Sequence, residues 1–255
     1  MISKPCDTSL RLDGALAVVT GAGSGIGLAI AQLFGEKGAR VFLCDRNAQA
    51  LEEAGKSIPQ SSTYLLDIAD PQAVAQAVSQ MERDGGPIGI LVNSAGVGDI
   101  QWAKDMSPAT WKKVLDVNLS GTFYMSQRVG QGMIAAGQGG KIISLASQAG
   151  LVAIDKHVAY SASKAGIISM TKSLAYEWGQ YGIQVNAISP TATETPIIMG
   201  YWDEPERMAR TLENTPAGRY CKPVEIACAA LFLASQGANM ITGENLVVDG
   251  GYTIH

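Results

Sequence analysis

Short, continuous apolar runs alternate along the chain with longer stretches whose apolar positions recur at helical spacing. The apolar runs are residues 15–20, 40–44, 63–66, 88–92, 141–145, 183–188 and 245–248. The amphipathic stretches are residues 26–37, 48–57, 71–83, 109–136, 158–181 and 223–235. Because a strand that is apolar on both faces is buried on both faces, the runs predict a parallel sheet between two layers of helices. The alternation predicts an α/β fold, a doubly wound Rossmann-type sheet with right-handed crossovers.

The segment at about 195–217 interrupts this alternation. Its three prolines and two aromatic residues of exposed type are Pro196, Pro205, Pro216, Tyr201 and Trp202. Because the segment follows a predicted strand, we expect it to lie over the carboxyl ends of the strands as a small substrate lid. No internal repeat, low-complexity tract or linker divides the sequence, so residues 1–255 are predicted to form a single domain.

The composition limits the partners of the protein. The 19 Lys and Arg and the 23 Asp and Glu give a formal net charge of −4, and no basic run is present, so nucleic acid is not an expected partner. No apolar stretch reaches the roughly 20 residues of a membrane-spanning helix, so no membrane partner is expected either. The first residues lack a signal-peptide pattern. We therefore expect a cytoplasmic protein that acts on a small molecule.

Cysteine and histidine usage argues against disulfides and against a metal site. These residues are Cys6, Cys44, Cys221, Cys228, His157 and His255. No CxxC pair occurs, and without an export signal we expect free thiols in a reducing compartment. With two histidines in the chain, no protein metal site is predicted.

A glycine-rich loop joins the first predicted strand to the first predicted helix. Glycines permit a tight turn and a close approach of the backbone to a diphosphate, and the following helix offers free N–H groups and its positive dipole end. The expected cofactor contacts in this loop are Gly21, Ser24, Gly25, Ile26 and Gly27. A lone glycine-rich loop is weak evidence, but this one has the preceding strand and the following helix that a dinucleotide-binding motif requires.

Acidic residues stand at the ends of the next two strands. Asp45 lies 18 residues after Gly27, where a carboxylate accepts hydrogen bonds from the adenosine ribose and repels a 2′-phosphate, so NAD is expected rather than NADP. Arg46 could pair with a 2′-phosphate, but because Asp45 comes first we prefer a solvated arginine at the strand end. Asp67 could bind the adenine amino group while Ile68 packs on its ring. The alternative for Asp67 is a helix N-cap region.

Small residues follow the fourth predicted strand, at positions 93–96. Such residues at the carboxyl end of a strand let a cofactor lie close to the sheet, in the crevice where open α/β sheets bind ligands. Asn93, Ala95 and Gly96 are therefore candidate cofactor contacts, although the same residues also fit an ordinary turn.

Tyr160 and Lys164 lie four residues apart in a predicted helix, and Ser147 precedes Tyr160 by thirteen residues. Positions i and i+4 share one helix face, so the phenol and the ammonium can point into the same space. A nearby cation favours the phenolate and lowers a tyrosine pKa from about 10 toward a value useful for proton transfer. A surface pair has the same spacing, so the rest of the chain must decide between the two.

Taken in order, these motifs resemble those of the short-chain dehydrogenases/reductases. The resemblance is carried by the TGxxxGxG loop at 20–27, by residues 93–96, and by Asn118, Ser147, Tyr160, Lys164 and Pro190. It extends over about residues 12–252. The sequence departs from the usual pattern at Ser94 (usually Asn), at Thr191 (often Gly) and at Ala146 (Ser in many members). None of these departures removes a catalytic group.

The resemblance implies roles for four catalytic residues. Tyr160 would be the general acid/base on the substrate oxygen, and Lys164 would lower its pKa and hold the nicotinamide ribose. Ser147 would orient the substrate oxygen, and Asn118 would hold a water that links Lys164 to solvent. A hydride would then pass between the substrate carbon and NAD. The alternatives are an ordinary polar helix residue for Asn118 and a strand-end turn residue for Ser147.

Further cofactor contacts are expected after the sixth strand. Pro190 would lie beside the cofactor, and Thr193 and Thr195 could bind the nicotinamide carboxamide and a phosphate. The alternative for Thr195 is a helix N-cap, because Pro196 follows it. By resemblance, the protein is expected to be a homotetramer joined through two long helices and the C-terminal region.

The substrate signal is weaker than the cofactor signal. Candidate substrate contacts beside Ser147 and Tyr160 are Gln148, Asp155 and His157, with Trp102, Tyr201 and Trp202 as further pocket residues. The first three side chains donate or accept several hydrogen bonds, which favours a polyhydroxylated substrate over an acyl chain. The alternative is that Asp155 and His157 are solvated loop residues. Residues 189–196 and 248–254 are similar to those of sugar-alcohol (polyol) dehydrogenases of the family.

We therefore expect an enzyme that interconverts a secondary alcohol and a ketone with NAD(H), with a polyol as the leading substrate class. A 3-oxoacyl-thioester reductase is the first alternative. Those enzymes usually prefer NADPH and carry a basic residue near the glycine loop, where this sequence has Ser24 and Asp45. A cofactor-binding regulator without activity is the second alternative, and the intact Ser147, Tyr160 and Lys164 count against it.

Overall fold

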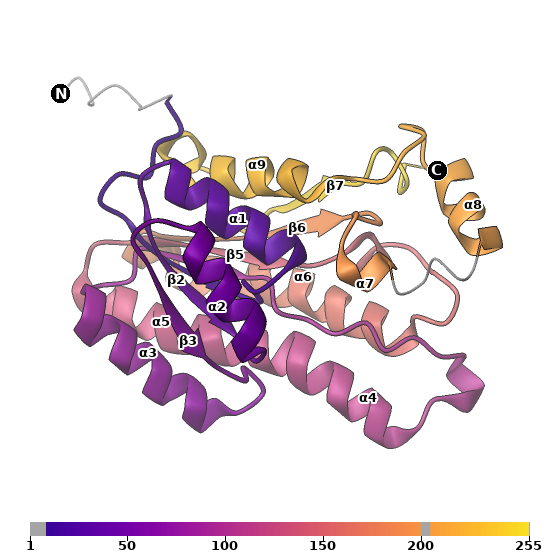
Figure 1. The fold of residues 1–255 in the computed structure, drawn as a ribbon, viewed down its shortest axis with the longest axis horizontal. Helices are drawn as coiled ribbons and strands as arrows, with labels where there is room; N and C mark the ends of the chain where they lie inside the picture. The colour runs from indigo at the N-terminus through magenta and orange to yellow at the C-terminus, as the bar shows by residue number, and fades with distance from the viewer. Residues whose placement is uncertain (1–8, 200–204, 255) are drawn as a thin grey trace.

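Seven parallel strands form one sheet in the order β3-β2-β1-β4-β5-β6-β7, and Figure 1 shows helices packed around this sheet. The strands are β1 (Leu16–Thr20), β2 (Arg40–Asp45), β3 (Ser61–Leu65), β4 (Ile90–Asn93), β5 (Gly140–Leu145), β6 (Ile183–Pro190) and β7 (Asn245–Val248). The computed structural model describes residues 9–199 and 205–254. Tyr201, Trp202, Cys6 and His255 lie outside the described residues. The predicted parallel Rossmann-type sheet is confirmed.

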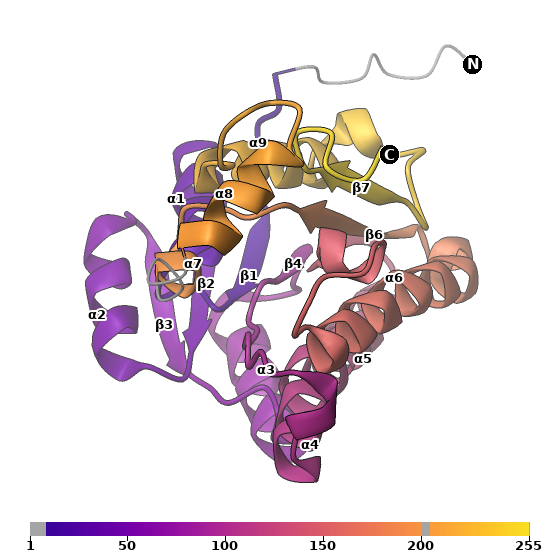
Figure 2. The same ribbon diagram turned by 90° about the vertical axis from the view of Figure 1, so that its right-hand side faces the viewer.

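Helices cover both faces of the sheet (Figure 2). One face carries α1 (Gly25–Glu36), α2 (Ala48–Ser57) and α9 (Pro223–Ala234), and the other carries α3 (Pro71–Gly85), α5 (Thr122–Ala136) and α6 (Val158–Trp178). Neighbouring strand residues pack against opposite helix layers. Val18 packs against the layer of α3, α5 and α6, and Val19 packs against the other layer. Burial of each such side chain contributes roughly 1.5–3 kcal/mol, which explains the continuously apolar strands. None of the helices in the described part of the chain has the length and apolar character to cross a membrane.

The stretch predicted as a long helix over 109–136 is helical throughout, but a π-helical turn, which was not predicted, divides it. Helix α4 (Pro108–Leu115) continues into a π-helical turn, Asp116–Gly121, and only then into α5. The turn is tightly packed, since a Cβ on Gly121 would lie 2.8 Å from Cγ1 of Ile68. A π-helical turn redirects the side chains around it and often accompanies a functional site. Here it places Asn118 against the loop that follows β4.

The segment predicted as a lid contains two short helices in its described part, α7 (Pro196–Met199) and α8 (Pro205–Glu213). Each begins at a proline, whose fixed φ and missing N–H suit the first helical position. Figure 1 shows both helices beyond the carboxyl end of β6, at the same end of the molecule as the C-terminus. The segment therefore lies where a substrate lid was expected, and its function as a lid stays a prediction.

Candidate active site

A cavity of about 430 Å³ lies at the carboxyl ends of the strands. It is lined by the loops that follow β1 to β6 and by the C-terminal segment that follows β7. In the sheet, β1 and β4 are neighbours, and the chain proceeds from them in opposite directions, through β2 and β3 and through β5 to β7. This is the topological switch point, where open α/β sheets bind ligands.

The glycine-rich loop lies so close to neighbouring backbone that side chains are excluded from it. A Cβ on Gly21 would lie 2.8 Å from Cα of Ala95, and a Cβ on Gly27 would meet the carbonyl oxygen of Gly21. Gly21 and Gly25 also have φ angles of +66° and +57°, which L side chains rarely adopt. Ser24 is the N-cap of α1 but makes no side-chain capping bond. The first N–H groups of α1 can therefore serve an anion.

Asp45 faces the glycine-rich loop and is held there by two backbone hydrogen bonds. Its Oδ2 accepts the N–H of Gly23 at 3.0 Å, and its Oδ1 accepts the N–H of Asn47 at 2.9 Å. Each carboxylate oxygen retains a lone pair for a ribose hydroxyl. Arg46 also lines the cavity but is exposed, as expected for a solvated arginine at a strand end.

Asp67 and Ile68 follow β3 and line the same cavity. Asp67 accepts the N–H of Ala69 at 2.9 Å. The N-cap of α3 is Asp70, which accepts two backbone N–H groups, so Asp67 is not the capping residue. Ile68 is 4% exposed and packs against the π-helical turn at Gly121. The two residues therefore combine an acceptor with an apolar wall, as an adenine site requires.

Tyr160 and Lys164 of α6 both line the cavity. Nζ of Lys164 lies 5.5 Å from the centroid of the Tyr160 ring and donates a hydrogen bond to the carbonyl oxygen of Leu145 at 2.6 Å. Lys164 is buried, and burial lowers its pKa to about 8, so most of its charge remains at neutral pH. A Cβ on Gly96 would lie 3.7 Å from this Nζ, so the glycine leaves space in front of the ammonium.

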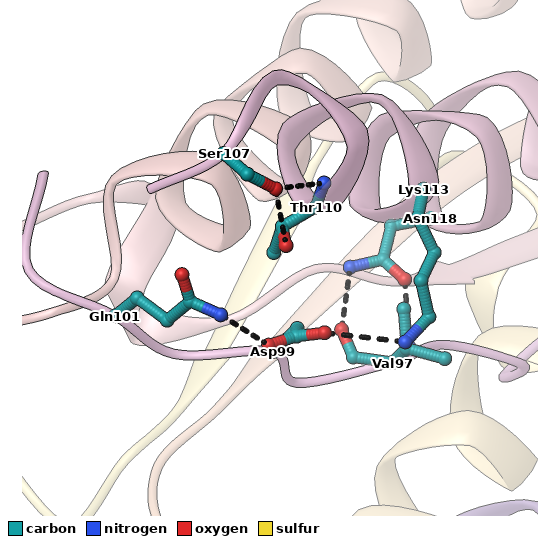
Figure 3. Close-up of polar contacts among 7 residues, drawn as sticks. All are labelled: Val97, Asp99, Gln101, Ser107, Thr110, Lys113 and Asn118. Atoms are coloured by element: carbon teal, nitrogen blue, oxygen red, sulfur yellow. Dashed lines mark hydrogen bonds and ion pairs between the residues drawn. The ribbon is translucent and has the colours of Figure 1, made fainter. Parts of the chain in front are cut away.

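Asn118 ties the loop after β4 to α6, and Figure 3 shows its two bonds to Val97 in that loop. Its Oδ1 accepts the N–H of Val97 at 2.8 Å, and its Nδ2 donates to the carbonyl oxygen of Val97 at 3.0 Å and to Oγ of Ser163 at 3.2 Å. Figure 3 also shows Asp99 paired with Lys113 of α4 at 3.2 Å, which holds the same loop from a second side. Asn118 lies behind the cavity wall, and its role in holding a water stays a prediction.

Ser147, Gln148 and His157 line the cavity. Oγ of Ser147 accepts the N–H of Ala149 at 3.1 Å, which leaves its O–H as a donor. The buried Oε1 of Gln148 has no hydrogen-bond partner within the described residues, which is costly unless a ligand or water supplies one. The His157 ring lies edge-on to Tyr160, with centroids 5.8 Å apart. The cavity is therefore polar beside the Tyr160 ring.

Three predicted contacts lie outside the cavity lining. Asp155 is exposed and pairs with Arg210 of α8 at 3.3 Å. Trp102 is 50% exposed. Asn93 is buried and points into the helix layer. Its Nδ2 donates to two serine hydroxyls at 2.9 and 3.2 Å, one of them on α5. The structure therefore does not bring Asp155, Trp102 and Asn93 into the cavity lining, and their predicted ligand contacts stay predictions.

The residues that follow β6 reach the glycine-rich loop. Pro190, Thr193 and Thr195 line the cavity. A Cβ on Gly25 would lie 3.2 Å from Cγ2 of Thr195, so the two residues are nearly in contact. Thr195 also immediately precedes α7. This position is consistent with both expectations for Thr195, a phosphate contact and a helix start.

Comparison with known proteins identifies the family. Residues 21–253 match the family described as enoyl-(acyl carrier protein) reductase, adh_short_C2. The chain belongs to the short-chain dehydrogenase/reductase family. It is 47% identical to D-threitol dehydrogenase of Mycolicibacterium smegmatis over 252 residues, which cover 97% of this chain and 96% of that protein. It is 46% identical to NAD-dependent glycerol dehydrogenase of Listeria innocua over 257 residues, which cover 100% of both.

A solved structure shares the fold of this short-chain dehydrogenase/reductase. Gluconate 5-dehydrogenase from Burkholderia cenocepacia, in complex with NADP and tartrate, is 34% identical with a TM-score of 0.91, covering 96% of this chain and 98% of that chain. The residues present here fit a nicotinamide dinucleotide: the loop at Gly21 and Gly27 admits backbone contact with a diphosphate, and Asp45 offers acceptors beside it. The protein is therefore an oxidoreductase with a nicotinamide cofactor site.

Several cavity residues of this short-chain dehydrogenase/reductase were not predicted from the sequence. They are Ile100, Ile154, Met208, Thr211, Tyr220 and Tyr252. They come from loops, from α8 and from the C-terminal segment, where no spacing rule links a residue to the site. A weak signal existed for three of them: Met208 and Thr211 lie in the segment predicted as a lid, and Tyr252 lies in the C-terminal stretch that is similar to that of polyol dehydrogenases.

Proposed function

We propose that this enzyme oxidises a secondary hydroxyl of a polyol with NAD and reduces the corresponding ketone with NADH. The observation that carries the proposal is the convergence of Ser147, Tyr160 and Lys164 on one cavity that Asp45 also lines. Two relatives that match nearly the whole chain are named for the polyols threitol and glycerol, which supports the substrate class. A thioester reductase is not favoured, because the glycine-rich loop faces a carboxylate.

Tyr160 is proposed as the general base in oxidation and the general acid in reduction. Its phenolate takes the proton from the substrate hydroxyl, and its phenol returns one to the ketone oxygen. The ammonium of Lys164, 5.5 Å from the ring, favours the phenolate by its charge. Because burial lowers the pKa of Lys164 to about 8, this group itself exchanges protons near neutral pH. The pair can therefore pass a proton onward.

Ser147 is proposed to hold the substrate oxygen. Its Oγ already accepts the N–H of Ala149, so its O–H donates to the substrate. When bound, the cofactor supplies the hydride acceptor at its nicotinamide ring. On the cofactor side, Lys164 would hold the nicotinamide ribose, and Thr193 and Thr195 would hold the carboxamide and a phosphate.

Asp45 is proposed to select NAD. Its two oxygens are fixed by backbone N–H groups and retain lone pairs for the ribose hydroxyls. A 2′-phosphate would place like charges side by side in a partly buried site, which is unfavourable. The glycerol dehydrogenase of Listeria innocua, named as NAD-dependent, is consistent with this assignment.

Asn118 and Lys164 are proposed to hold a relay water between them. A Cβ on Gly96 would lie 3.3 Å from Oδ1 of Asn118 and 3.7 Å from Nζ of Lys164. The two groups therefore border the same small space beside the glycine. A water there would carry the proton from Lys164 toward solvent, with Asn118 fixed by its bonds to Val97.

The test is a panel of substrates with each cofactor. We expect reduction of NAD, and little reduction of NADP, with polyols of four to six carbons. The opposite pattern, no polyol oxidised but acetoacetyl thioesters reduced with NADPH, would show that the enzyme is a thioester reductase. Enzyme that binds NADH but turns over neither class would support the inactive regulator.

We propose that the enzyme is a homotetramer. Apolar side chains are exposed on α6, at Val158 and Tyr176, and on the α9 and β7 side, at Phe232 and Val247. Two separate exposed apolar faces suit two kinds of contact with further copies of the chain. Light scattering tests the proposal: a tetramer mass is expected, and a monomer at working concentration would refute it.

A further inference from the structure

The C-terminal segment reaches the substrate end of the cavity. Tyr252 lines the cavity together with Met208 and Thr211 of α8. Asp45 ends β2, near one edge of the sheet, whereas Tyr252 follows β7, which is the opposite edge strand. The adenosine site and Tyr252 are therefore at opposite ends of the cavity. Tyr160 lies on α6, which connects β5 to β6 and so lies between the two ends. A substrate held at Tyr160 can therefore extend toward Tyr252.

A buried carboxylate fixes the turn that carries Tyr252. Oδ1 of Asp249 accepts the N–H of Gly251 at 2.9 Å, and Oδ2 accepts the N–H and the hydroxyl of Thr253 at 2.8 and 2.7 Å. Asp249 is 6% exposed. Burial opposes its ionisation, but the bonds from Thr253 and Gly251 outweigh burial and hold the pKa of this carboxyl below its usual value. Gly250 and Gly251 have φ angles of +64° and +89°, so the sharp turn depends on glycine.

The same turn packs against the chain that leaves α8. The N–H of Ala217 donates to the carbonyl oxygen of Gly250 at 3.0 Å. A Cβ on Gly250 would lie 2.9 Å from Cγ2 of Thr215, and a Cβ on Gly251 would lie 3.0 Å from Cγ of Pro216. With no room for a side chain between them, the turn and the end of the predicted lid form one packed unit.

We propose that residues 249–253 form a chain-length selector, in which the Tyr252 phenol binds a distal hydroxyl of the polyol and Asp249 is the positioning residue. This inference rests on the proposed function. A phenol both donates and accepts a hydrogen bond, so it matches a hydroxyl, which does the same. In this arrangement a three-carbon polyol held at Ser147 and Tyr160 would end before this turn, whereas five- and six-carbon polyols would extend to it.

The experiment compares KM and kcat for polyols of three to six carbons with Tyr252→Phe and a matched control, Tyr181→Phe. Tyr181 lies before β6, at the amino end of the sheet, outside the cavity lining. For Tyr252→Phe we expect a KM increase of about five- to tenfold for the longer polyols, the effect of one neutral hydrogen bond. The KM for glycerol, the kcat values and the NADH dissociation constant should change less than twofold. Tyr181→Phe should change none of these.

Asp249→Asn separates positioning from a general structural effect. It should raise KM for the longer polyols in the same way, and it should add nothing in a double variant with Tyr252→Phe, because both changes remove one interaction. Additive effects, or equal losses for glycerol, would overturn the positioning role. If wild type oxidises polyols and Tyr252→Phe leaves the ratio of the six-carbon to the three-carbon KM unchanged, the chain-length selector is overturned. A wild-type enzyme that oxidises no polyol would instead refute the proposed function.

Discussion

Replacing Asp45 with Asn should change the cofactor preference of this enzyme. The carboxylate has two lone pairs left for ribose hydroxyls after accepting the N–H groups of Gly23 and Asn47. The amide keeps one acceptor oxygen, so about one charge-assisted bond is lost. At about 1.5–3 kcal/mol for such a bond, NADH should bind roughly ten- to hundredfold more weakly.

The same substitution should help NADPH, because it removes the like charge beside the 2′-phosphate. Two unit charges about 6 Å apart interact by about 3 kcal/mol at an effective dielectric constant of about 20. This gain offsets the lost bond, so NADPH affinity should stay level or rise. The ratio of the NADH to the NADPH dissociation constant should therefore rise by roughly a hundredfold.

Titration calorimetry with NADH and NADPH measures both dissociation constants directly. Asp155→Asn is the matched control, since this carboxylate is exposed, pairs with Arg210 and lies outside the cavity lining. The Asp45 variant should also lose about 1 kcal/mol of stability, because its amide N–H₂ faces one of the two backbone donors. If NADH and NADPH affinities fell by the same factor, Asp45 would not be the group that discriminates between the two cofactors.

Two further substitutions probe the cofactor loop and the buried lysine. Gly27→Ala should abolish NADH binding and lower the melting temperature, because its Cβ would meet the carbonyl oxygen of Gly21. In the control, Gly179→Ala, the added Cβ would have no atom within 4 Å, so neither property should change. Lys164→Met should remove a pH dependence of stability measured by urea unfolding. Below pH 8 Lys164 is protonated in both the folded and the unfolded state, so burial of its charge lowers the stability of the folded wild type. Between its folded pKa of about 8 and its unfolded value of 10.5, the unfolded chain binds more protons, so wild type should gain about 3 kcal/mol relative to Lys164→Met. A constant difference across this range would contradict the buried ammonium.

The strands and the main helices were predictable because the positions of their apolar residues indicate which side chains are buried. Val18 and Val19 pack on opposite helix layers, so only a continuously apolar strand fits this position. The glycine-rich loop was predictable for a related reason, since the lack of a side chain at Gly21 and Gly27 is itself the structural requirement. The sequence also placed Tyr160 and Lys164 on one cavity-facing side of α6.

Other features depend on tertiary contacts that have no local signature. The π-helical turn at Asn118 bonds to Val97, 21 residues earlier, and packs at Gly121 on Ile68, both of them contacts between distant parts of the chain. The side-chain direction of Asn93 depends on two serines that are distant in sequence. Tyr252 reaches the cavity because its turn packs against the segment that leaves α8, a contact that no periodicity reveals.

The rate of NADH formation from D-threitol by wild type and by Tyr160→Phe tests whether Tyr160 transfers the proton in the proposed NAD-linked polyol oxidation. Wild type should show steady turnover. The variant should lose at least a hundredfold in kcat with an unchanged NADH dissociation constant, because phenylalanine keeps the ring beside Lys164 but cannot carry the proton. A Tyr160→Phe enzyme that oxidises D-threitol at the wild-type rate would contradict this role of Tyr160.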